Sequence, residues 1–370
     1  MLSLKRNEQT MKAVILVGGQ GTRLRPLTCN MPKATVPLLN RPYLEHLLSY
    51  LKQHGVDDII LAMGYNPDPI KKALGDGSYL GIHLMYLVED SPLGTAGAVK
   101  NAESFLDDTF VVFNGDILTD INLSEMIKLH KKARPKVSIA LTPVDNPTIY
   151  GVIETDSNDM VHRFVEKPSW SEVTTNMINA GLYIIEPEVL QRIPPATRYM
   201  FEHHLFPGLL GDGESIYGYK SNEYWIDIGT PQKYLKAHYD LMGKLSDSVI
   251  KPDKTVHIHE NAVISGQVLI GNNSVIGAHS QIHGPAVIGS NCHLSQGVIF
   301  DKSVLWQNCV IGEKTIVKDC IIANRVTLEN NLNLEECVIG DDITLRTGDR
   351  IERGASIWPE SCSDSNGANN

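Results

Sequence analysis

Hydrophobic and polar residues follow one pattern in the first two thirds of the chain and another in the last third. Between Met11 and about Leu245, short apolar runs alternate with amphipathic stretches. Runs such as AVILV, DIILAM and TFVVFN predict strands, and YLEHLLSYLKQHG predicts a helix that ends at Gly55. Because these strands are continuously apolar and separated by helices, we expect an α/β domain with a mainly parallel sheet covered on both faces.

After about residue 264, a bulky apolar residue recurs at every sixth position, with two slips in the pattern. The series comprises Ile264, Ile270, Ile276, Ile282, Ile288, Leu294 and Phe300, then Val304, Val310, Ile316, Ile322, Leu328 and Leu334, and finally Ile339, Leu345, Ile351 and Ile357. A period of six fits neither an α-helix nor a hairpin. It predicts a parallel β-helix of about five coils, in which each periodic residue points inward.

The two periods predict two domains in the 370 residues. We expect the α/β domain over 11–245, a linker at 246–254 and the β-helix over 255–358, with flexible tails at 1–10 and 359–370. No apolar run reaches the roughly 18 residues of a membrane span, and the first ten residues lack an apolar signal segment. We therefore expect a cytoplasmic protein that does not bind membranes.

Charge and cysteine content narrow the class further. The formal net charge of −10 argues against a nucleic-acid partner, because nucleic-acid binding needs an extended positively charged surface. The cysteines form no CxxC pair and have no spacing typical of zinc, so we expect reduced cysteines that mostly pack in the interior. They are Cys29, Cys292, Cys309, Cys320, Cys337 and Cys362.

Positive charge is concentrated near the N-terminus. The window 11–44 contains no Asp or Glu, although it holds five basic residues. Its glycine loop, VGGQGTRLRPLT, follows the first predicted strand and matches neither the P-loop nor the dinucleotide fingerprint. Glycines allow main-chain N–H groups to approach an anion, and Arg23 and Lys33 follow without a neighbouring carboxylate. The window therefore predicts a triphosphate site.

The segment GGQGTRLRPLTCNMPK resembles the signature of the sugar-1-phosphate nucleotidylyltransferases. The resemblance continues through EDSPLGTAGAV (89–99), FNGD (113–116), GVIE (151–154), FVEKP (164–168), NAGLYI (179–184) and WIDIGTP (225–231). It is strongest toward mannose-1-phosphate guanylyltransferase-like members. It implies a Rossmann-like nucleotidyltransferase domain with a mixed, mainly parallel sheet, followed by a left-handed parallel β-helix. Ala34 departs from the proline of many members, which alters local stiffness and no charge.

The family reaction is attack by a sugar-1-phosphate oxygen on the α-phosphorus of a nucleoside triphosphate, which expels pyrophosphate. The resemblance implies that Arg23 and Lys33 hold the triphosphate and that Lys167 holds the sugar phosphate. It also implies that Asp116 and Asp227 share Mg²⁺, a hard cation that binds carboxylates together with phosphates. These five residues form the expected catalytic set.

The resemblance also implies the binding residues. Those for the nucleotide are Gly18, Gly19, Gly21, Thr22, Glu89, Gly94, Thr95, Gly97 and Gly115. Those for the sugar phosphate are Gly151, Glu166, Lys167 and Asn179. In a regular strand Glu166 and Lys167 would point in opposite directions, but Pro168 indicates that the strand ends here. Both side chains can then face one pocket.

The substrates are less closely defined by the residues. The Glu89 carboxylate offers two acceptors to the N1–H and N2–H₂ donors of guanine, which favours GTP, with mannose-1-phosphate as the expected sugar. Glucose-1-phosphate with UTP, dTTP or ATP stays open, as does a regulatory non-catalytic subunit. A further alternative is an acyltransferase activity of the β-helix, with His279, His283 or His293 as base.

Two further expectations concern assembly and metal ligands. We expect a homo-oligomer that forms through the β-helix, the catalytic domain or both. The pairs His203–His204 and His257–His259 have no third ligand at metal spacing, and we interpret them as ordinary histidines.

Overall fold

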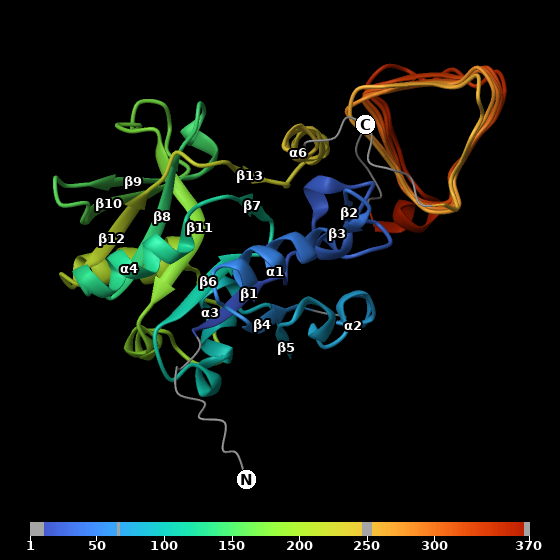
Figure 1. Cartoon of the computed structure of the whole chain (residues 1–370). Helices are drawn as coiled ribbons and strands as arrows, with labels where there is room; N and C mark the ends of the chain where they lie inside the picture. The colour runs from blue at the N-terminus through green and yellow to red at the C-terminus, as the bar shows by residue number, and fades with distance from the viewer. Residues whose placement is uncertain (1–10, 65–66, 246–253, 366–370) are drawn as a thin grey trace, which may run out of the picture. The chain divides into compact units, whose positions relative to one another are not determined.

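The computed structural model describes residues 11–64, 67–245 and 254–365. The chain forms two compact units (Figure 1). Unit 1 extends to Gly19 and continues over Leu44–Ile226, and unit 2 contains Gln20–Tyr43 and continues from Asp227. The predicted tail at 1–10 and nearly all of the predicted linker lie outside the described residues. None of the described helices is long and apolar enough to cross a membrane.

Unit 1 is built on a nine-stranded mixed sheet. Its strands are β1 (Lys12–Leu16), β4 (Asp58–Met63), β5 (His83–Val88), β6 (Phe110–Asn114), β8 (Val137–Pro143), β9 (Gly151–Thr155), β10 (Val161–Glu166), β11 (Met177–Ile185) and β12 (Ile216–Lys220). Strands β5, β4, β1 and β6 are neighbours and run parallel, whereas β11 is antiparallel to β6, β8 and β9. The mixed, mainly parallel Rossmann-like sheet is confirmed.

The helices are α1 (Tyr43–Gln53), α2 (Asp68–Leu74), α3 (Gly94–Asn101), α4 (Leu123–Ala133), α5 (Phe206–Gly211) and α6 (Pro231–Gly243). Local sequence sets their ends. Asn122 caps α4 by accepting a hydrogen bond from Glu125 N (3.0 Å). After α1, Gly55 adopts φ +77° and donates its N–H to Lys52 O, so the predicted helix and its glycine terminus are confirmed.

The register of the parallel strands brings three chain segments to one edge of the sheet. Leu16 of β1 lies level with Ala62 of β4 and with Asn114 of β6. The glycine loop follows β1, and Gly115 and Asp116 follow β6. The carboxyl ends of parallel strands are where ligands bind in open α/β sheets. A short two-stranded sheet of β7 (Ile117–Thr119) and β13 (Trp225–Asp227) continues beyond β6.

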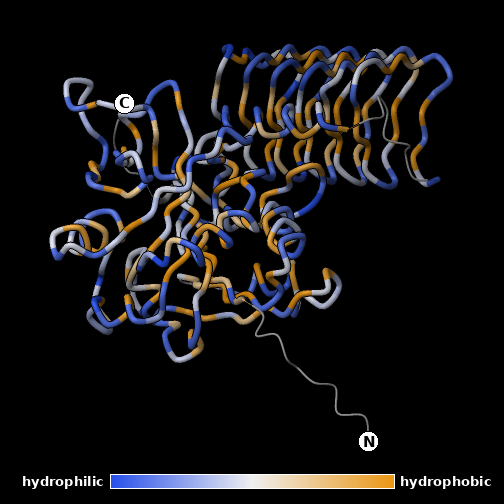
Figure 2. The backbone as a smooth tube through the Cα atoms, turned by 60° about the vertical axis from the view of Figure 1, so that its left-hand side comes forward, coloured by the Kyte–Doolittle hydropathy of each residue, from blue (hydrophilic) through white to orange (hydrophobic). Residues whose placement is uncertain are grey.

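Most of unit 2 is a left-handed parallel β-helix, as predicted. Seen along its axis, it is a triangular prism (Figure 1), and from the side its coils repeat the same hydrophobic positions in register (Figure 2). Three sheets of six, five and six strands line its sides within the described residues. The strands are β14 (His257–Ile258), β15 (Val263–Ser265), β16 (Val268–Ile270), β17 (Val275–Ile276), β18 (Gln281–His283), β19 (Ala286–Ile288), β20 (His293–Leu294), β21 (Ile299–Asp301), β22 (Val304–Leu305), β23 (Val310–Ile311), β24 (Ile316–Lys318), β25 (Ile321–Ile322), β26 (Thr327–Leu328), β27 (Asn333–Glu335), β28 (Val338–Ile339), β29 (Thr344–Leu345) and β30 (Ser356–Ile357).

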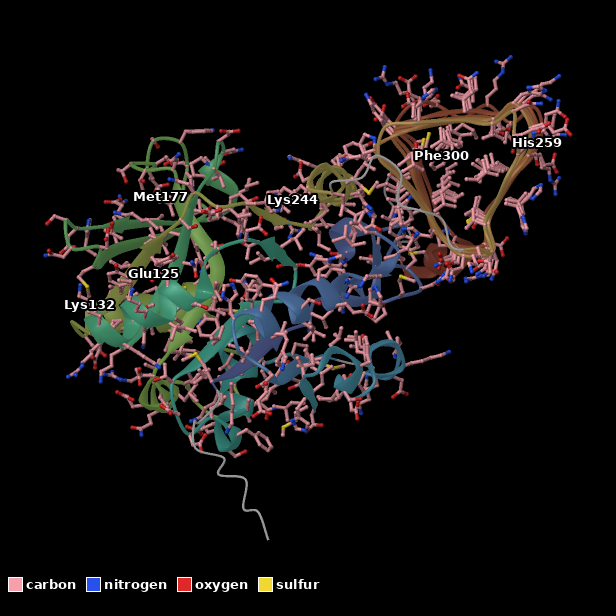
Figure 3. All side chains as sticks on the ribbon, in the orientation of Figure 1. Glu125, Lys132, Met177, Lys244, His259 and Phe300 are labelled. Carbon is pink, nitrogen blue, oxygen red and sulfur yellow. A yellow bond between two sulfur atoms is a disulfide. The ribbon has the colours of Figure 1, made fainter. Side chains whose placement is uncertain are left out.

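The predicted inward ladder is correct up to Phe300, which lies inside the prism, whereas His259 lies at its outside (Figure 3). It is then wrong by one residue over a full coil. The inward residues are Leu305, Ile311 and Val317, not Val304, Val310 and Ile316. Ile288 pairs with Leu305, so this coil has 17 residues instead of 18. Because side chains alternate in a strand, losing one corner residue exchanges the inward and outward sets.

One outer face of the β-helix is also apolar and covered. Val287, Val304 and Ile321 point outward from the sheet of β19, β22 and β25, yet each is 1% exposed. Helix α6 lies on this face, where Trp306 Nε1 donates to Tyr234 Oη (3.0 Å). Segment 20–43 joins it through Asn40 Nδ2, which donates to Ile288 O (2.8 Å). These contacts explain why segment 20–43 belongs to unit 2.

The cysteines are a partial correction. Four of them, Cys292, Cys309, Cys320 and Cys337, are free and buried in the β-helix interior as expected. Cys29 and Cys362, however, form a disulfide, which the expectation of reduced cysteines missed. The predicted flexible tail at 359–370 is likewise wrong in part. Residues Glu360–Ser365 form a 3₁₀ helix, η8, and the disulfide anchors it.

Candidate functional site

The family segments are divided between the two units. Unit 1 holds those after β1, β5 and β6 and those on β9–β11. Gly115 is packed so closely that a Cβ would lie 2.5 Å from Leu16 O, and its N–H donates to that oxygen (3.0 Å). Only glycine fits there, which fixes the half-buried Asp116 directly after it. Gly18 and Gly19 are exposed at the end of β1.

The segment after β5 is organised by Glu89. Its Oε2 accepts a hydrogen bond from Leu93 N (2.9 Å), which closes the loop before α3. Burial raises the pKa of the Glu89 carboxyl, and the Leu93 hydrogen bond opposes this effect. One of the two acceptors that the sequence assigned to a nucleobase therefore already has a main-chain partner.

The start of α3 packs against residues 197–202. A Cβ on Gly94 would lie 2.8 Å from Tyr199 O, and one on Gly97 would lie 2.6 Å from Thr197 O. Thr95 Oγ1 accepts from Phe201 N (2.9 Å) and donates to Glu202 Oε2 (3.2 Å). Close packing therefore explains why glycine occupies positions 94 and 97. Their role in nucleotide binding remains a prediction.

The predicted sugar-phosphate residues occupy neighbouring strands. Gly151 on β9 is opposite Glu166 on β10, and a Cβ on this glycine would lie 2.8 Å from Glu166 Oε2. Lys167 has φ +49°, which ends the strand and breaks its alternation. Its Nζ lies 3.7 Å from Glu166 Oε1, so the two side chains face the same side. The Lys167 side chain is 67% exposed.

Asn179 has a local role in the structure. Its Nδ2 donates to Tyr183 Oη (2.9 Å) and its Oδ1 accepts from Gly181 N (3.0 Å), at an irregularity in β11. Glu202 was not identified from the sequence. It lies in the π-helical turn Phe201–Leu205, and burial raises the pKa of its carboxyl, with the Glu166 charge adding to the effect. An acidic residue among Phe201, Leu205 and Phe206 was the available signal.

Unit 2 holds Gly21, Thr22, Arg23, Lys33 and Asp227. Gly21 begins the short 3₁₀ turn η1 (Thr22–Leu24), with φ +63°, and Lys33 begins η2 (Lys33–Thr35). A Cβ on Gly21 would lie 3.1 Å from Lys33 Cβ. Thr28 Oγ1 donates to Gly21 O (2.7 Å), which closes this part of the chain into one compact turn. Ala34, the departure from the family, is buried beside Lys33.

Asp227 and Arg23 meet at Gly229. A Cβ on this glycine would lie 2.7 Å from Asp227 Oδ1 and 3.2 Å from Arg23 Nη2. Asp227 is 8% exposed, accepts from Gly229 N (3.2 Å) and forms an ion pair with Lys233. Lys233, on the first turn of α6, was not identified from the sequence. The spacing of six residues from Asp227 gave no recognisable signal.

Three of the histidines, His204, His259 and His283, have ordinary local partners. His204 Nδ1 accepts from Met200 N (3.0 Å), His259 Nδ1 accepts from Asn261 N (3.1 Å), and His283 Nδ1 contacts Ser265 Oγ (2.7 Å). Within the described ranges, no three His, Cys, Asp or Glu side chains cluster as a metal site. A magnesium ion that takes two carboxylates and substrate phosphates needs no such cluster.

Comparison with known proteins finds two families along the chain, and the first of them includes segment 20–43 and α6 of unit 2. Residues 12–244 match the family "Nucleotidyl transferase", and residues 248–354 match the "EIF2B subunit epsilon LbH domain". Mannose-1-phosphate guanylyltransferase of Mycobacterium tuberculosis is 38% identical over 296 residues, which are 78% of this chain and 79% of that protein. UTP–glucose-1-phosphate uridylyltransferase of a Synechocystis species is 34% identical over 80% of this chain and 83% of its own.

A solved structure is similar in fold. HddC from Yersinia pseudotuberculosis complexed with GMP-PN is 30% identical, with a TM-score of 0.55. The match covers 62% of this chain and 99% of that one.

Proposed function

The chain belongs to the nucleotidyl transferase family and is a sugar-1-phosphate nucleotidyltransferase, and on this premise we propose that its substrates are GTP and mannose-1-phosphate. An oxygen of the sugar phosphate attacks the α-phosphorus. The bond to the bridging oxygen of the β-phosphate breaks, and pyrophosphate leaves. The observation that carries the choice of substrates is the high similarity to mannose-1-phosphate guanylyltransferases.

The roles of the cations follow from the charge of the reactants. Two polyanions must meet, so neutralisation and positioning supply most of the catalysis. Arg23 and Lys33 neutralise the triphosphate and the departing pyrophosphate, and the main chain of Gly18, Gly19, Gly21 and Thr22 lines its path. Lys167 neutralises the attacking phosphate. Its exposed ammonium beside Glu166 supports this role, because Glu166 can orient both the lysine and a sugar hydroxyl.

The nucleobase lies against the segment from Glu89 to Gly97, and the nucleotide passes Gly115, whose close packing on Leu16 positions Asp116 directly after β6. The sugar lies against Gly151, Glu166 and Asn179. We place Glu202 with these residues, because the Glu166 charge acts on the Glu202 carboxyl, which also accepts a hydrogen bond from Thr95. A buried acceptor of this kind suits a sugar hydroxyl.

Asp116 and Asp227 suit a magnesium ion. Carboxylate oxygens are the ligands that Mg²⁺ prefers, and the ion pair of Asp227 with the Lys233 ammonium supports a cation-binding role for this carboxylate. When bound, the ion supplies positive charge to the triphosphate oxygens. Lys233 then balances the buried Asp227 whenever substrate is absent.

The assay for the proposed function is pyrophosphate release from a matrix of GTP, UTP, dTTP and ATP against mannose-1-phosphate and glucose-1-phosphate, with Mg²⁺. We expect the highest kcat/KM for GTP with mannose-1-phosphate. A higher value for UTP with glucose-1-phosphate would support the alternative suggested by the uridylyltransferase relative. Absence of turnover with every pair would indicate a regulatory subunit.

The proposal includes a cytoplasmic location and a homo-oligomer. The outer face of the sheet β15–β18–β21–β24–β27 supports the oligomer. Val263 is 55% exposed there, and Ile299 and Ile316 point outward beside the inward Phe300 and Val317. Light scattering at micromolar concentration should give a dimer or larger species, and Ile316→Lys should lower its mass. A wild-type monomer would contradict this part.

A further inference from the structure

The segment between Arg23 and Lys33 is fastened to the far end of the β-helix. Cys29 is disulfide-bonded to Cys362, which is 333 residues away in the sequence and lies on η8. Pro26 packs in the same place, because a Cβ on Gly340 would lie 3.3 Å from Pro26 Cβ and 2.5 Å from Pro359 Cδ. All of these residues belong to unit 2. One covalent bond and one close contact therefore tie this segment to the last coil.

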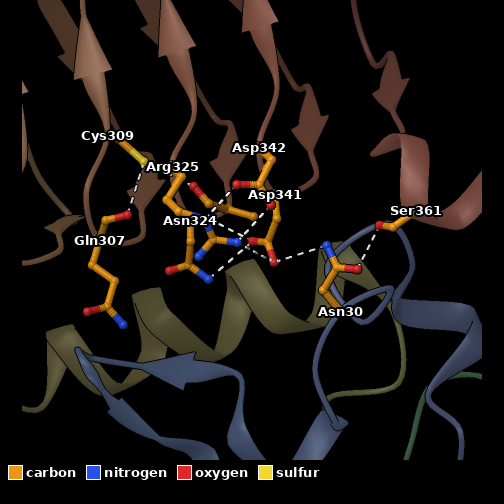
Figure 4. A network of polar contacts seen from close by, with 9 residues as sticks. Asn30, Gln307, Cys309, Asn324, Arg325, Asp341, Asp342 and Ser361 are labelled. Atoms are coloured by element: carbon orange, nitrogen blue, oxygen red, sulfur yellow. Dashed lines mark hydrogen bonds and ion pairs between the residues drawn. The ribbon is translucent and has the colours of Figure 1, made fainter.

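A second attachment runs through Asn30 (Figure 4). Its Oδ1 accepts a hydrogen bond from Ser361 Oγ (2.7 Å), and its Nδ2 lies 3.5 Å from Asp341 Oδ2 as a donor. Asp341 is only 4% exposed. Its Oδ1 accepts from Asn324 N (2.8 Å) and from Asn324 Nδ2 (3.1 Å), so the carboxylate is held rigidly on the β-helix.

The attached segment is in direct contact with the residues proposed to bind the triphosphate. Thr28, next to Cys29, donates to Gly21 O, and Gly21 lies against Lys33. Arg23 follows Gly21 within the turn η1. A displacement of residues 26–30 would therefore move the turn that carries Arg23 and the start of η2 at Lys33. Displacements of about 1 Å at a binding site are enough to change kinetics strongly.

We propose that the Cys29–Cys362 disulfide and the Asn30–Asp341 contact form a thiol-reversible clamp that positions Arg23 and Lys33 for the nucleotide. This inference rests on the proposed function and adds a form of regulation to it. Asn30 and Asp341 are positioning residues, because they act through the segment and not on substrate. In a cytoplasmic protein a disulfide is usually transient or redox-sensing, which fits a clamp that opens.

Opening requires a thiol reductant, and a dithiol such as dithiothreitol supplies two electrons and two protons. A thiolate attacks one sulfur of the disulfide, a mixed disulfide forms, and the second thiol displaces the protein sulfur. The products are the Cys29 and Cys362 thiols and a cyclic disulfide. Cys29 is partly exposed, whereas the four free cysteines are at most 1% exposed, so the reductant acts at one place.

The first test compares the oxidised and the dithiothreitol-treated full-length protein by hydrogen exchange and by steady-state pyrophosphate release. We expect reduction to speed the exchange of amides in residues 26–33 and to raise the KM for GTP by about three- to tenfold. The kcat should change less than twofold. Cys362→Ser should match the reduced wild type and should not respond to the dithiol.

Asn40→Gly is the matched control. It removes another hydrogen bond between segment 20–43 and the β-helix, but it leaves the clamp intact. Glycine also tolerates the φ of +62° at this position. We expect this variant to keep the full response to dithiothreitol. Loss of that response would mean that any loosening of the segment suffices, which would overturn the assignment to the clamp.

The second test exchanges the two polar partners. Asn30→Asp places two carboxylates together and should raise the KM for GTP as reduction does. Adding Asp341→Asn restores one donor and one acceptor, because the new amide can donate to residue 30 and still accept from Asn324. The double variant should therefore return KM to within about twofold of wild type. Failure of this rescue would overturn the role of the Asn30–Asp341 contact.

The two readouts separate the possible failures. If the oxidised protein turns over substrate and its KM does not respond to reduction, the clamp is overturned. If no substrate pair gives pyrophosphate, the proposed function is wrong. The clamp is then tested by hydrogen exchange alone. Faster exchange in residues 26–33 on reduction supports it, and unchanged exchange overturns it.

Discussion

The sheet of unit 1 and the β-helix of unit 2 are both made of parallel strands with buried aliphatic side chains, but they use their strand ends differently. In the sheet, the segments after β1, β5 and β6 differ from one another, and each carries part of the family signature. In the β-helix, equivalent corners repeat the same polar residue, as where Asn273 Nδ2 donates to Asn291 (3.1 Å), and Asn291 Nδ2 to Asn308 (3.2 Å).

This difference suggests a functional role for the strand ends of the sheet and a structural role for those of the β-helix. Unlike strand ends bring different functional groups to one edge, whereas identical corners hydrogen-bond to each other along the β-helix. The exception in the β-helix is its covered face, together with the coil that holds Asp341. There the regular repeat carries α6 and segment 20–43. Under the proposed clamp, the β-helix contributes to the site by holding residues 26–30 in place.

The largest effect is expected at the carboxylate that we assign to the metal. Asp227→Asn keeps the acceptor for Gly229 N but removes the charge, so it should lower kcat by about 10³-fold. The melting temperature should change little. Asp240→Asn is the matched control, because Asp240 also pairs with a lysine of α6, Lys236 (2.7 Å). It should leave kcat within twofold, and an equally active Asp227→Asn would refute the metal role.

The next effect concerns the β-helix and compares two adjacent residues. Ile311 is fully buried in the core, and Val310 is 41% exposed. Ile311→Thr removes buried methyl groups and buries a hydroxyl, so it should lower the free energy of unfolding by about 3 kcal/mol. Val310→Thr should cost less than about 0.5 kcal/mol. Denaturant unfolding measures both values, and a larger cost for Val310→Thr than for Ile311→Thr would restore the predicted ladder, in which Val310 points inward.

Much of the fold was predictable because the hydrophobic pattern of each domain is visible in the sequence. What the pattern did not predict is which residues of the β-helix point inward after Phe300. After Phe300 the six-residue spacing is interrupted. The predicted ladder resumes four positions later, at Val304, whereas in the structure the next inward residue is Leu305, five positions later. Both positions are aliphatic, so hydropathy cannot choose between them. The buried outward residues Val287, Val304 and Ile321 could have been found, since they recur every 17 residues.

The candidate site was predictable as a set of motifs and not as a set of contacts. Alternation left the directions of Glu166 and Lys167 open, and the positive φ of Lys167 decides them. The disulfide joins residues 333 positions apart, and cysteine count alone cannot pair them. Glu202 and Lys233 are further examples, because each becomes relevant only through residues that the fold brings near.

The smallest effect is a pH dependence that distinguishes the two units. In unit 1, His130 of α4 is 1% exposed, and its Nδ1 and Nε2 contact Ser138 Oγ (2.7 Å) and Glu186 Oε1 (2.9 Å). Burial lowers the pKa of His130, although the Glu186 hydrogen bond and charge oppose this, and Lys131 adds to it. None of the described histidines of the β-helix is buried.

Below the ordinary histidine pKa of about 6.5, the unfolded chain binds a proton that folded His130 does not bind. Stability should therefore fall as pH falls through this value, by at most about 1.4 kcal/mol per pH unit for one proton, and level off below the folded pKa. Hydrogen exchange of β8 peptides at pH 5.5 and 8 should report this loss, while β21 peptides of the β-helix should not. His130→Gln should flatten the dependence in β8. If β8 and β21 lose protection equally in the wild type, the acid response does not arise at His130. The sheet of unit 1 and the β-helix would then not differ in their response to pH.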